Sequence, residues 1–249
     1  MSRSRIRHEC QRQVVLRGPH VRARQVNELI LSLDTTHEFG SVALLEGETV
    51  IEEILLHSPD GFGHVLYEYL ERLFSRHGRR VDQVACFAAS SGPGSFTGVR
   101  VGLACVKGLA EAAGKEVAGV SNLAALARFG SVRQRATVVD ARRGEVYGAV
   151  YDADGRIICQ ETVSSFSKWL DTLPGGEIEF ISPDFSPYLG ALAGTRFETA
   201  KITAAPRALA TAIGRIALER FRAGLAQDPA EIDANYVRRS DAELFWREG

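Results

Sequence analysis

The residues with the clearest potential for chemistry form a glycine-rich segment, SGPGSFTG, at positions 91–98. It follows an apolar run, residues 84–89, and precedes a run with helical periodicity, so the order predicts a strand, a tight loop and a helix N-terminus. Backbone N–H groups at such a junction can bind a phosphate or contact another backbone segment. The G-x-G-x-x-x-G spacing is one residue longer than the dinucleotide fingerprint, and the Gly-Lys-Ser/Thr ending of a P-loop is missing. The segment therefore predicts either a phosphate site or a turn that packs a helix tightly on its strand.

Two aspartates, Asp34 and Asp140, end apolar runs that lie about 106 residues apart. Each is followed by a turn and two further β-like runs, which indicates a weak internal repeat. Each carboxylate either belongs to a site or caps its own turn. Arginines after Asp140 are either solvated turn charges or contacts to a phosphate, a nucleotide or a partner's carboxylate. A candidate vestigial phosphate or nucleotide site comprises Asp34, Thr35, Thr36, Gly92, Gly94, Asp140 and Arg142.

Three-stranded meanders must position the two aspartates. The runs expected to form strands are 29–33, 41–45 and 49–55 in the first half, and 136–139, 145–151 and 156–163 in the second. The helical runs are 64–77, 99–113 and 208–223. This order predicts a duplicated α/β fold with two mixed sheets. We expect a first lobe of residues 27–128 plus about 206–225, a second lobe of residues 129–205, and a C-terminal tail of residues 226–249.

The composition, 45% hydrophobic and 24% charged over 249 residues, is typical of a soluble globular protein. No apolar run approaches the ~20 residues that cross a bilayer. Four scattered cysteines without a C-x-x-C pair favour buried thiols in a reducing cytoplasm over disulfides or metal ligands. We therefore expect a cytoplasmic protein without a membrane partner.

Residues 1–26 carry seven arginines against one acidic residue, Glu9, although the whole chain has a net charge of −1. Little apolar periodicity accompanies these charges, so we expect a basic N-terminal tail that is disordered and dispensable for folding. A basic arm for RNA is the alternative. A translation start farther along the chain is a third interpretation, because Met1 is the only methionine.

Several distinctive segments together resemble the bacterial TsaB (YeaZ) family: ILSLDTTHEFGSVA at 30–43, SGPGSFTGVRVG at 91–102, GVSNLAAL at 119–126, DARRGEVY at 140–147 and ANYVR at 234–238. The likeness extends from residue 29 to about 239. It implies an actin-like (ASKHA) fold of two ribonuclease-H-like lobes. It also implies a scaffold subunit of the complex that forms N6-threonylcarbamoyladenosine at position 37 of tRNAs reading ANN codons. The implied partners are a TsaD-like catalytic paralogue, a TsaE-like ATPase, tRNA through the complex, and a second copy when the protein is alone.

Within this resemblance, the catalytic paralogue carries a metal-binding H-x-x-x-H after a Gly-Val pair. The matching positions after Gly119-Val120 are Asn122 and Leu126. Leucine cannot ligate a metal and asparagine is a poor transition-metal ligand. We therefore expect no catalytic residue, no metal and no cofactor in this chain.

Two enzyme classes remain as alternatives. A stand-alone actin-like ATPase or kinase is one, because residues 34–36 resemble a phosphate-binding hairpin. A peptidase is less well supported, because GSFTG at 94–98 is not the G-x-S-x-G elbow. Ser95 or Thr97 is instead expected to cap the following helix.

An interaction surface is expected on helices 64–77 and 99–113. The second helix is apolar beyond one stripe and so needs a second burial partner, either a neighbouring helix or another subunit. Tyr67 and Tyr69 cannot both face one core. The predicted interface residues are Tyr67, Leu70, Phe74, Val99, Leu103, Val106, Lys107 and Ala110.

Overall fold

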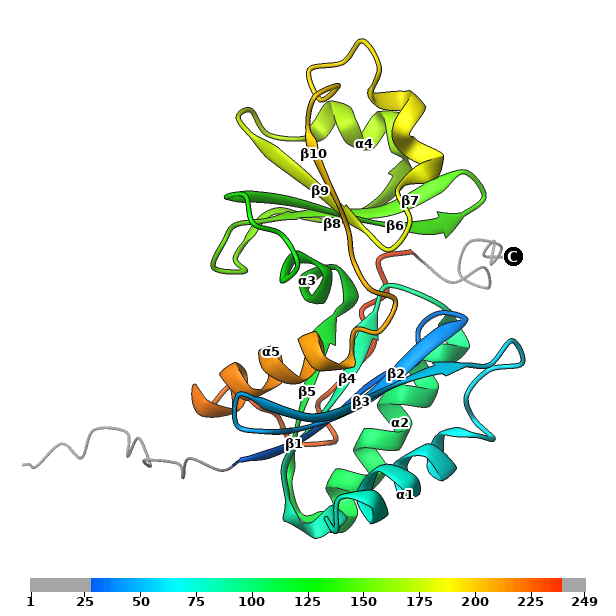
Figure 1. The fold of residues 1–249 in the computed structure, drawn as a ribbon, viewed down its shortest axis with the longest axis vertical. Coiled ribbons are helices and arrows are strands. Elements are labelled where there is room, and N and C mark those ends of the chain that lie inside the picture. The colour runs from blue at the N-terminus through cyan, green and yellow to red at the C-terminus, as the bar shows by residue number, and fades with distance from the viewer. Residues whose placement is uncertain (1–27, 239–249) are drawn as a thin grey trace, which may run out of the picture.

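Two lobes, each built on a five-stranded mixed sheet, are stacked on one another in Figure 1. The structure is a computed structural model that describes residues 28–238. In the first lobe β1 pairs antiparallel with β2 and parallel with β4, and the sheet order is β3-β2-β1-β4-β5. The strands are β1 (Leu29–Asp34), β2 (Phe39–Glu46), β3 (Thr49–His57), β4 (Val84–Gly92) and β5 (Glu116–Ser121).

The second lobe repeats this topology. Its sheet order is β8-β7-β6-β9-β10, so each lobe has a meander whose first strand pairs in parallel with the fourth. The strands are β6 (Gln134–Arg142), β7 (Glu145–Tyr151), β8 (Ile157–Ser165), β9 (Ile178–Ser182) and β10 (Lys201–Ala204). The predicted internal repeat and the mixed α/β architecture are confirmed.

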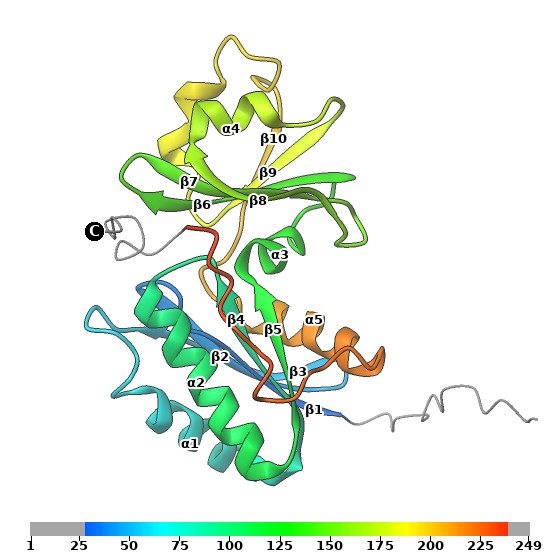
Figure 2. The ribbon, with the colours of Figure 1, turned by 180° about the vertical axis from the view of Figure 1, so that it is seen from behind.

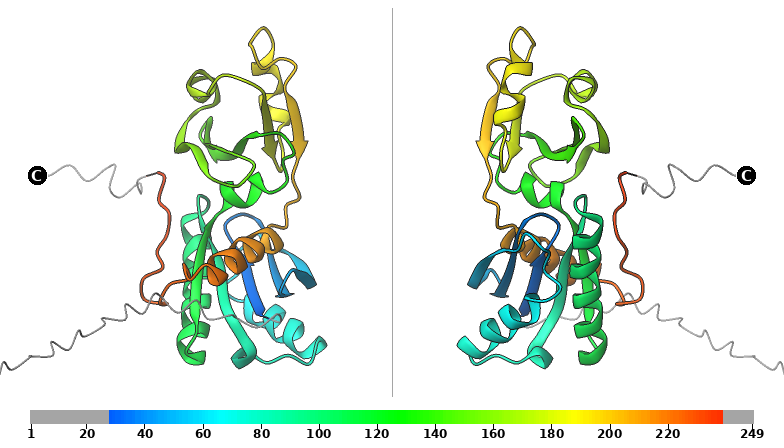
Figure 3. Two further views of the ribbon diagram at one scale, coloured as in Figure 1. Left: turned by 90° about the vertical axis from the view of Figure 1, so that its left-hand side faces the viewer. Right: turned by 90° about the vertical axis from the view of Figure 1, so that its right-hand side faces the viewer.

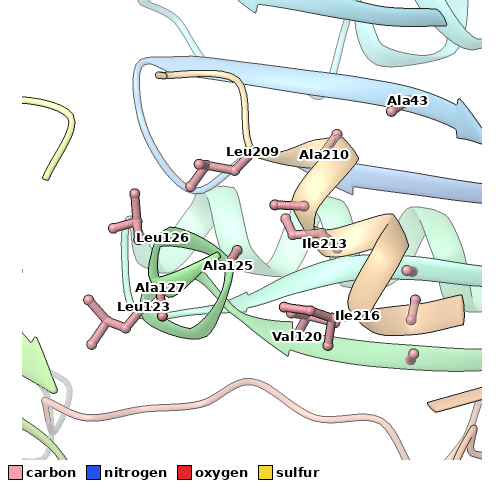
Figure 4. Packing of buried hydrophobic residues seen from close by; sticks show 14 of the residues in the cluster. Ala43, Val120, Leu123, Ala125, Leu126, Ala127, Leu209, Ala210, Ile213 and Ile216 are labelled. Atoms are coloured by element: carbon pink, nitrogen blue, oxygen red, sulfur yellow. The ribbon is translucent and has the colours of Figure 1, made fainter. Parts of the chain in front are cut away.

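Helices cover both faces of the first sheet. One face packs on α1 (Leu66–Arg76) and α2 (Phe96–Ala113), and the other on α5 (Ala210–Arg222), which returns from the second lobe. Figure 4 shows α5 side chains beside those of α3 (Asn122–Ala127), a short helix at the waist between the lobes. The expected end signals of α2 are present. Ser95 Oγ accepts a hydrogen bond from Gly98 N at 3.2 Å, and Gly114 ends the helix at a φ of 60°.

The second lobe has a smaller core that is rich in aromatic rings. It lies between its sheet, α4 (Phe166–Thr172) and the short 3₁₀ segment η2 (Ser186–Leu192). The first lobe has its own 3₁₀ turn, η1 (Val81–Gln83). Within residues 28–238, none of the helices combines the length and the apolar character that a membrane crossing requires.

Most of the predicted interface residues are buried within this chain. Six of them are at most 6% exposed and belong to the core under α1 and α2: Leu70, Phe74, Val99, Leu103, Val106 and Ala110. The second burial partner that α2 needs is therefore supplied by α1 and the sheet of its own lobe. Tyr67 is 62% exposed and Lys107 is partly exposed. Tyr69 packs against the core, in agreement with the expectation that Tyr67 and Tyr69 cannot both face it.

The described part of the predicted C-terminal tail, residues 226–238, lies along both lobes, and Figure 2 shows it as a red segment. We call it the C-terminal strap. Gln227 exchanges two backbone hydrogen bonds with Val117, at 2.8 and 2.9 Å. Ile232 is 2% exposed in the first-lobe core, and Arg238 Nη1 donates to the carbonyl of Ala141 in the second lobe at 2.9 Å. The predicted N-terminal tail, residues 1–26, and the last residues, 239–249, lie outside the described residues.

Candidate interlobe site

A cleft of about 270 Å³ lies at the waist, where the strands β1, β6 and β9 end. Figure 3 shows the two lobes from the side, with this waist between them. Ligands of open α/β sheets commonly bind beyond the carboxyl ends of the strands. The lining residues come from both lobes: Asp34, His37, Glu38, Phe39, Asn122, Leu126, Val139, Asp140, Ser182, Pro183, Asp184, Arg207 and Leu209.

The two repeated aspartates both line this cleft, and each caps its own turn. Asp34 Oδ1 accepts hydrogen bonds from Thr36 N at 3.0 Å and Thr36 Oγ1 at 2.7 Å. Asp140 Oδ1 accepts one from Arg142 N at 2.8 Å, although Asp140 is exposed and Asp34 is buried. Burial raises the pKa of Asp34, against the opposing effects of His37 and the Thr36 hydrogen bonds. The repeat therefore places two turn-capping carboxylates at the edge of the cleft.

The glycine segment contacts another backbone segment, which was one of the two interpretations of its sequence. A Cβ at Gly94 would lie 2.7 Å from the carbonyl oxygen of Thr36, and one at Gly102 would lie 2.6 Å from Thr35 Oγ1. Ser95 N donates to the Thr36 carbonyl at 2.7 Å, and Thr35 Oγ1 donates to the Gly98 carbonyl at 2.7 Å. The glycines therefore allow α2 to approach the β1–β2 turn.

This packing encloses several residues of the predicted phosphate site. Thr35 and Thr36 are at most 2% exposed. Gly92 has a φ of 102° and faces the backbone of the C-terminal strap, because a Cβ there would lie 3.2 Å from the Asn235 carbonyl oxygen. Of the seven predicted residues, Asp34 and Asp140 meet in the cleft, whereas Thr35, Thr36, Gly92, Gly94 and Arg142 do not line it.

Asn122 and Leu126, which the family resemblance aligns with metal ligands, are engaged within the chain. Asn122 is fully buried, with Nδ2 donating to Thr36 Oγ1 and to the Pro93 carbonyl, and Oδ1 accepting from Ser90 Oγ. Leu126 is fully buried in the core. An amide that already has three partners and an alkyl side chain do not fit a transition metal. Among residues 28–238 there is no group of three His, Cys, Asp or Glu side chains that could hold a metal.

Sequence reasoning missed two cleft residues, His37 and Arg207. His37 Nδ1 lies 2.9 Å from Thr36 Oγ1, and its buried Nε2 has no hydrogen-bond partner. Burial lowers the pKa of His37, and Arg142 lowers it further, against Asp34 and Asp140. The Arg207 guanidinium lies 4.6 Å from the centre of the Phe39 ring. His37 could have been identified from the sequence because it directly follows Asp34-Thr35-Thr36. Arg207 follows the second lobe, and no pattern in the neighbouring residues marks it as part of a site.

Comparison with known proteins assigns this chain to a family. Residues 62–244 match the family described as TsaD, tRNA N6-adenosine threonylcarbamoyltransferase. The tRNA threonylcarbamoyladenosine biosynthesis protein TsaB of Escherichia coli is 36% identical over 129 residues, which are 50% of this chain and 55% of that protein. TsaB of Haemophilus influenzae is 38% identical over 127 residues, 49% of this chain and 52% of that protein. The chain thus aligns with about half the length of these curated relatives.

Solved structures share the fold. The YeaZ protein of Pseudomonas aeruginosa has a TM-score of 0.72 at 24% identity, covering 84% of this chain and 99% of that one. A second Pseudomonas aeruginosa structure, described as an uncharacterized protein with similarity to peptidase YEAZ, has a TM-score of 0.73 at 24% identity, covering 85% of this chain and all of that one. The family match covers well over half of the chain. The protein therefore belongs to the TsaD family of tRNA N6-adenosine threonylcarbamoyltransferases and is similar within it to the TsaB proteins.

Proposed function

We propose that the chain is a non-catalytic scaffold subunit of the complex that forms N6-threonylcarbamoyladenosine at position 37 of tRNAs reading ANN codons. It would support a TsaD-like catalytic partner, and a TsaE-like ATPase would act on the assembled complex. The observation that carries this proposal is the state of Asn122 and Leu126. Both occupy positions of metal ligands in the paralogue, and both are buried in contacts with their own chain.

The chemistry of the transfer supports this division of labour. Attack of an adenine nitrogen on an adenylated carbamate places charge on the reacting carbonyl, which a metal ion can stabilise as a Lewis acid. Asn122 and Leu126 of this chain do not fit such an ion. The two repeated aspartates of the cleft, Asp34 and Asp140, are also engaged, because each caps its own turn. We therefore assign the catalytic groups to the partner.

The enzyme alternatives find less support in the geometry. An ATPase of this architecture needs backbone N–H groups directed at phosphates, whereas Ser95 N in the glycine segment donates to Thr36. A serine peptidase needs a nucleophile beside a base, whereas Ser95 Oγ caps α2 through Gly98 N. Both observations favour structural roles for these residues.

The face formed by α1 and α2 is the proposed surface for the TsaD-like partner and, in competition with it, for a second copy. A groove of about 380 Å³ lies there, lined by Tyr67, Leu70, Glu71, Phe74, Ser75, Arg79, Arg80, Val81 and Leu109. Tyr67 stands at its edge with 62% of its surface exposed. Tyrosine is enriched at protein interfaces because it offers a large apolar ring and a polar end.

Association can be tested by size-exclusion chromatography of the chain alone and mixed with a TsaD-like protein. Tyr67→Glu should leave the chain folded and abolish both self-association and the mixed complex. Ile157→Glu is the matched control, because Ile157 is 48% exposed and lies on β8 in the sheet of the other lobe. Undiminished association of the Tyr67 variant would contradict the proposed surface, and no association of the parent chain would contradict the proposed function.

A further inference from the structure

An exposed group of flat side chains lies where the C-terminal strap passes the start of α2. Phe96 and Tyr236 are 45% and 47% exposed, and their ring centres are 5.6 Å apart at an interplanar angle of 32°. The Arg100 guanidinium lies 3.5 Å from the centre of the Phe96 ring, and Arg100 Nε donates to Tyr236 Oη at 2.9 Å. The three side chains therefore contact one another, while Phe96 and Tyr236 each remain partly exposed to solvent.

This group is preorganised for stacking. The Arg100 hydrogen bond fixes the Tyr236 ring, and the strap is itself anchored next to it, because Asn235 N donates to the Ser91 carbonyl at 2.7 Å. Aromatic and guanidinium planes are the surfaces on which unpaired nucleobases stack. A surface that is ordered before binding loses less side-chain entropy when a ligand arrives.

Arginines lie on one side of the aromatic pair, and the Glu161 carboxylate on the other side accepts a hydrogen bond from Asn235 Nδ2 at 2.6 Å. Two residues beyond Tyr236, Arg238 contacts the Ala141 carbonyl and the Glu145 carboxylate at the β6–β7 turn. Arg142 and Arg143 are exposed at the tip of that turn, with φ values of 62° and 57°. Figures 1 and 2 show the turn on the same side of the waist as the start of α2. The acidic groups at this turn have partners, because Glu145 pairs with Arg238 and Asp140 caps the turn.

We propose that Phe96, Arg100 and Tyr236 form a stacking surface for an unpaired RNA base, with Arg142 and Arg143 contacting the neighbouring phosphates. That the RNA is a tRNA rests on the proposed function. RNA is favoured over a protein partner because the flat side chains are bordered by arginines, which suit phosphates. The surface would let this subunit hold an unpaired loop while the catalytic partner modifies it.

The test is fluorescence anisotropy of the full chain with two labelled RNAs, a stem-loop with an unpaired loop and a fully paired duplex of equal length. Phe96→Ala and Tyr236→Ala should each weaken stem-loop binding by about tenfold, since stacking on one aromatic ring contributes about that much. Binding to the duplex should stay unchanged. Phe96→Leu keeps an apolar contact with Arg100 and should also weaken stem-loop binding, and Leu189→Ala removes an exposed apolar side chain of the second lobe without effect.

Charge is tested separately. Changing Arg142 and Arg143 to glutamine should weaken stem-loop and duplex binding alike and reduce the salt dependence by about one phosphate contact for each arginine. Residues 1–26 are the same in every variant, so their contribution cancels in the comparison. Melting curves of all variants establish that each is folded.

Three results would overturn the inference. They are equal affinity of the parent chain for stem-loop and duplex, unchanged stem-loop binding after Phe96→Ala, and loss of binding to the TsaD-like protein rather than to RNA. The last would identify the surface as a protein interface. If the parent chain associates with the TsaD-like protein, any of these results refutes only the RNA surface. Absence of that association refutes the proposed function and leaves the RNA measurement independent.

Discussion

Gly98→Ala should destabilise the first lobe strongly, because the start of α2 is held against the β1–β2 turn. An alanine Cβ at position 98 would lie 3.1 Å from the Thr35 carbonyl carbon and closer still to its oxygen. Thr35 is 2% exposed, so its backbone cannot move aside without disturbing the core. The clash would instead displace the first turn of α2.

The magnitude follows from the contacts that this displacement disturbs. Forcing one extra methyl group into close-packed surroundings costs roughly 1–3 kcal/mol. The Thr35–Gly98 hydrogen bond and the Ser95 cap contribute about 1 kcal/mol each. We expect a total loss of about 3 kcal/mol, partly offset because alanine is a better helix former than glycine. In a chain of this size each kcal/mol lowers the melting temperature by about 2–4 °C.

Thermal unfolding followed by circular dichroism measures this loss. Gly108→Ala is the matched control, since Gly108 lies on the same helix and a Cβ there meets nothing within 4 Å. It should raise stability by up to about 1 kcal/mol. If Gly98→Ala were as stable as Gly108→Ala, the glycine segment would not be packed against Thr35 and Thr36. The backbone N–H groups of that segment would then be available to bind a phosphate.

Three further substitutions test other parts of the account. Leu103→Glu should unfold the first lobe, because Leu103 is 5% exposed. Ala104→Glu, at the exposed neighbouring position, should remain folded. A Leu103→Glu variant that stays folded but no longer self-associates would instead place Leu103 at an interface. Burial opposes ionisation of Glu179, but hydrogen bonds from Thr203, the backbone of Val132 and Ser131, and Lys201 lower its pKa from 4.5 to about 2. Because the pKa of Glu179 is lower in the folded than in the unfolded state, this carboxylate stabilises the fold above about pH 4.5, and the effect is lost as the pH falls through 2. Glu179→Gln should therefore cost on the order of 3 kcal/mol of unfolding free energy at pH 7 and should weaken the loss of stability at acid pH. An unchanged acid branch of the stability–pH curve would contradict this role of Glu179. Ile232→Ala should lower the free energy of unfolding in urea by about 2–4 kcal/mol, because Ile232 is the strap residue that is 2% exposed in the first-lobe core. A negligible change would show that the strap does not pack on the first lobe.

Local patterns were sufficient to predict the repeated meanders and the C-terminal end of α2, whereas its start was predicted at residue 99 and lies at Phe96. Alternation of apolar residues identified the strands around Asp34 and Asp140, and Ser95 and Gly114 carried recognisable cap signals. Both depend on neighbours in the chain. The duplicated mixed sheets followed from the same local signals.

Tertiary partners could not be read from those patterns. The absence of Cβ atoms in the glycine segment predicts that another group lies close to its backbone. It does not predict whether that group is a phosphate or residues 35–36. The apolar faces of α1 and α2 predict burial, but not whether the cover comes from the same lobe or from another subunit. The strap was missed because residues 226–238 have little periodicity, and their position depends on single contacts such as that of Ile232.

The scaffold role is tested most directly by reconstituting the modification from purified components and measuring N6-threonylcarbamoyladenosine in tRNA by mass spectrometry. The chain alone, supplied with the activated threonylcarbamoyl intermediate, should leave tRNA unmodified. The TsaD-like protein with this chain should modify it, and omission of this chain should reduce the yield. Modified tRNA from this chain alone, or full activity of the TsaD-like protein without it, would contradict the scaffold role.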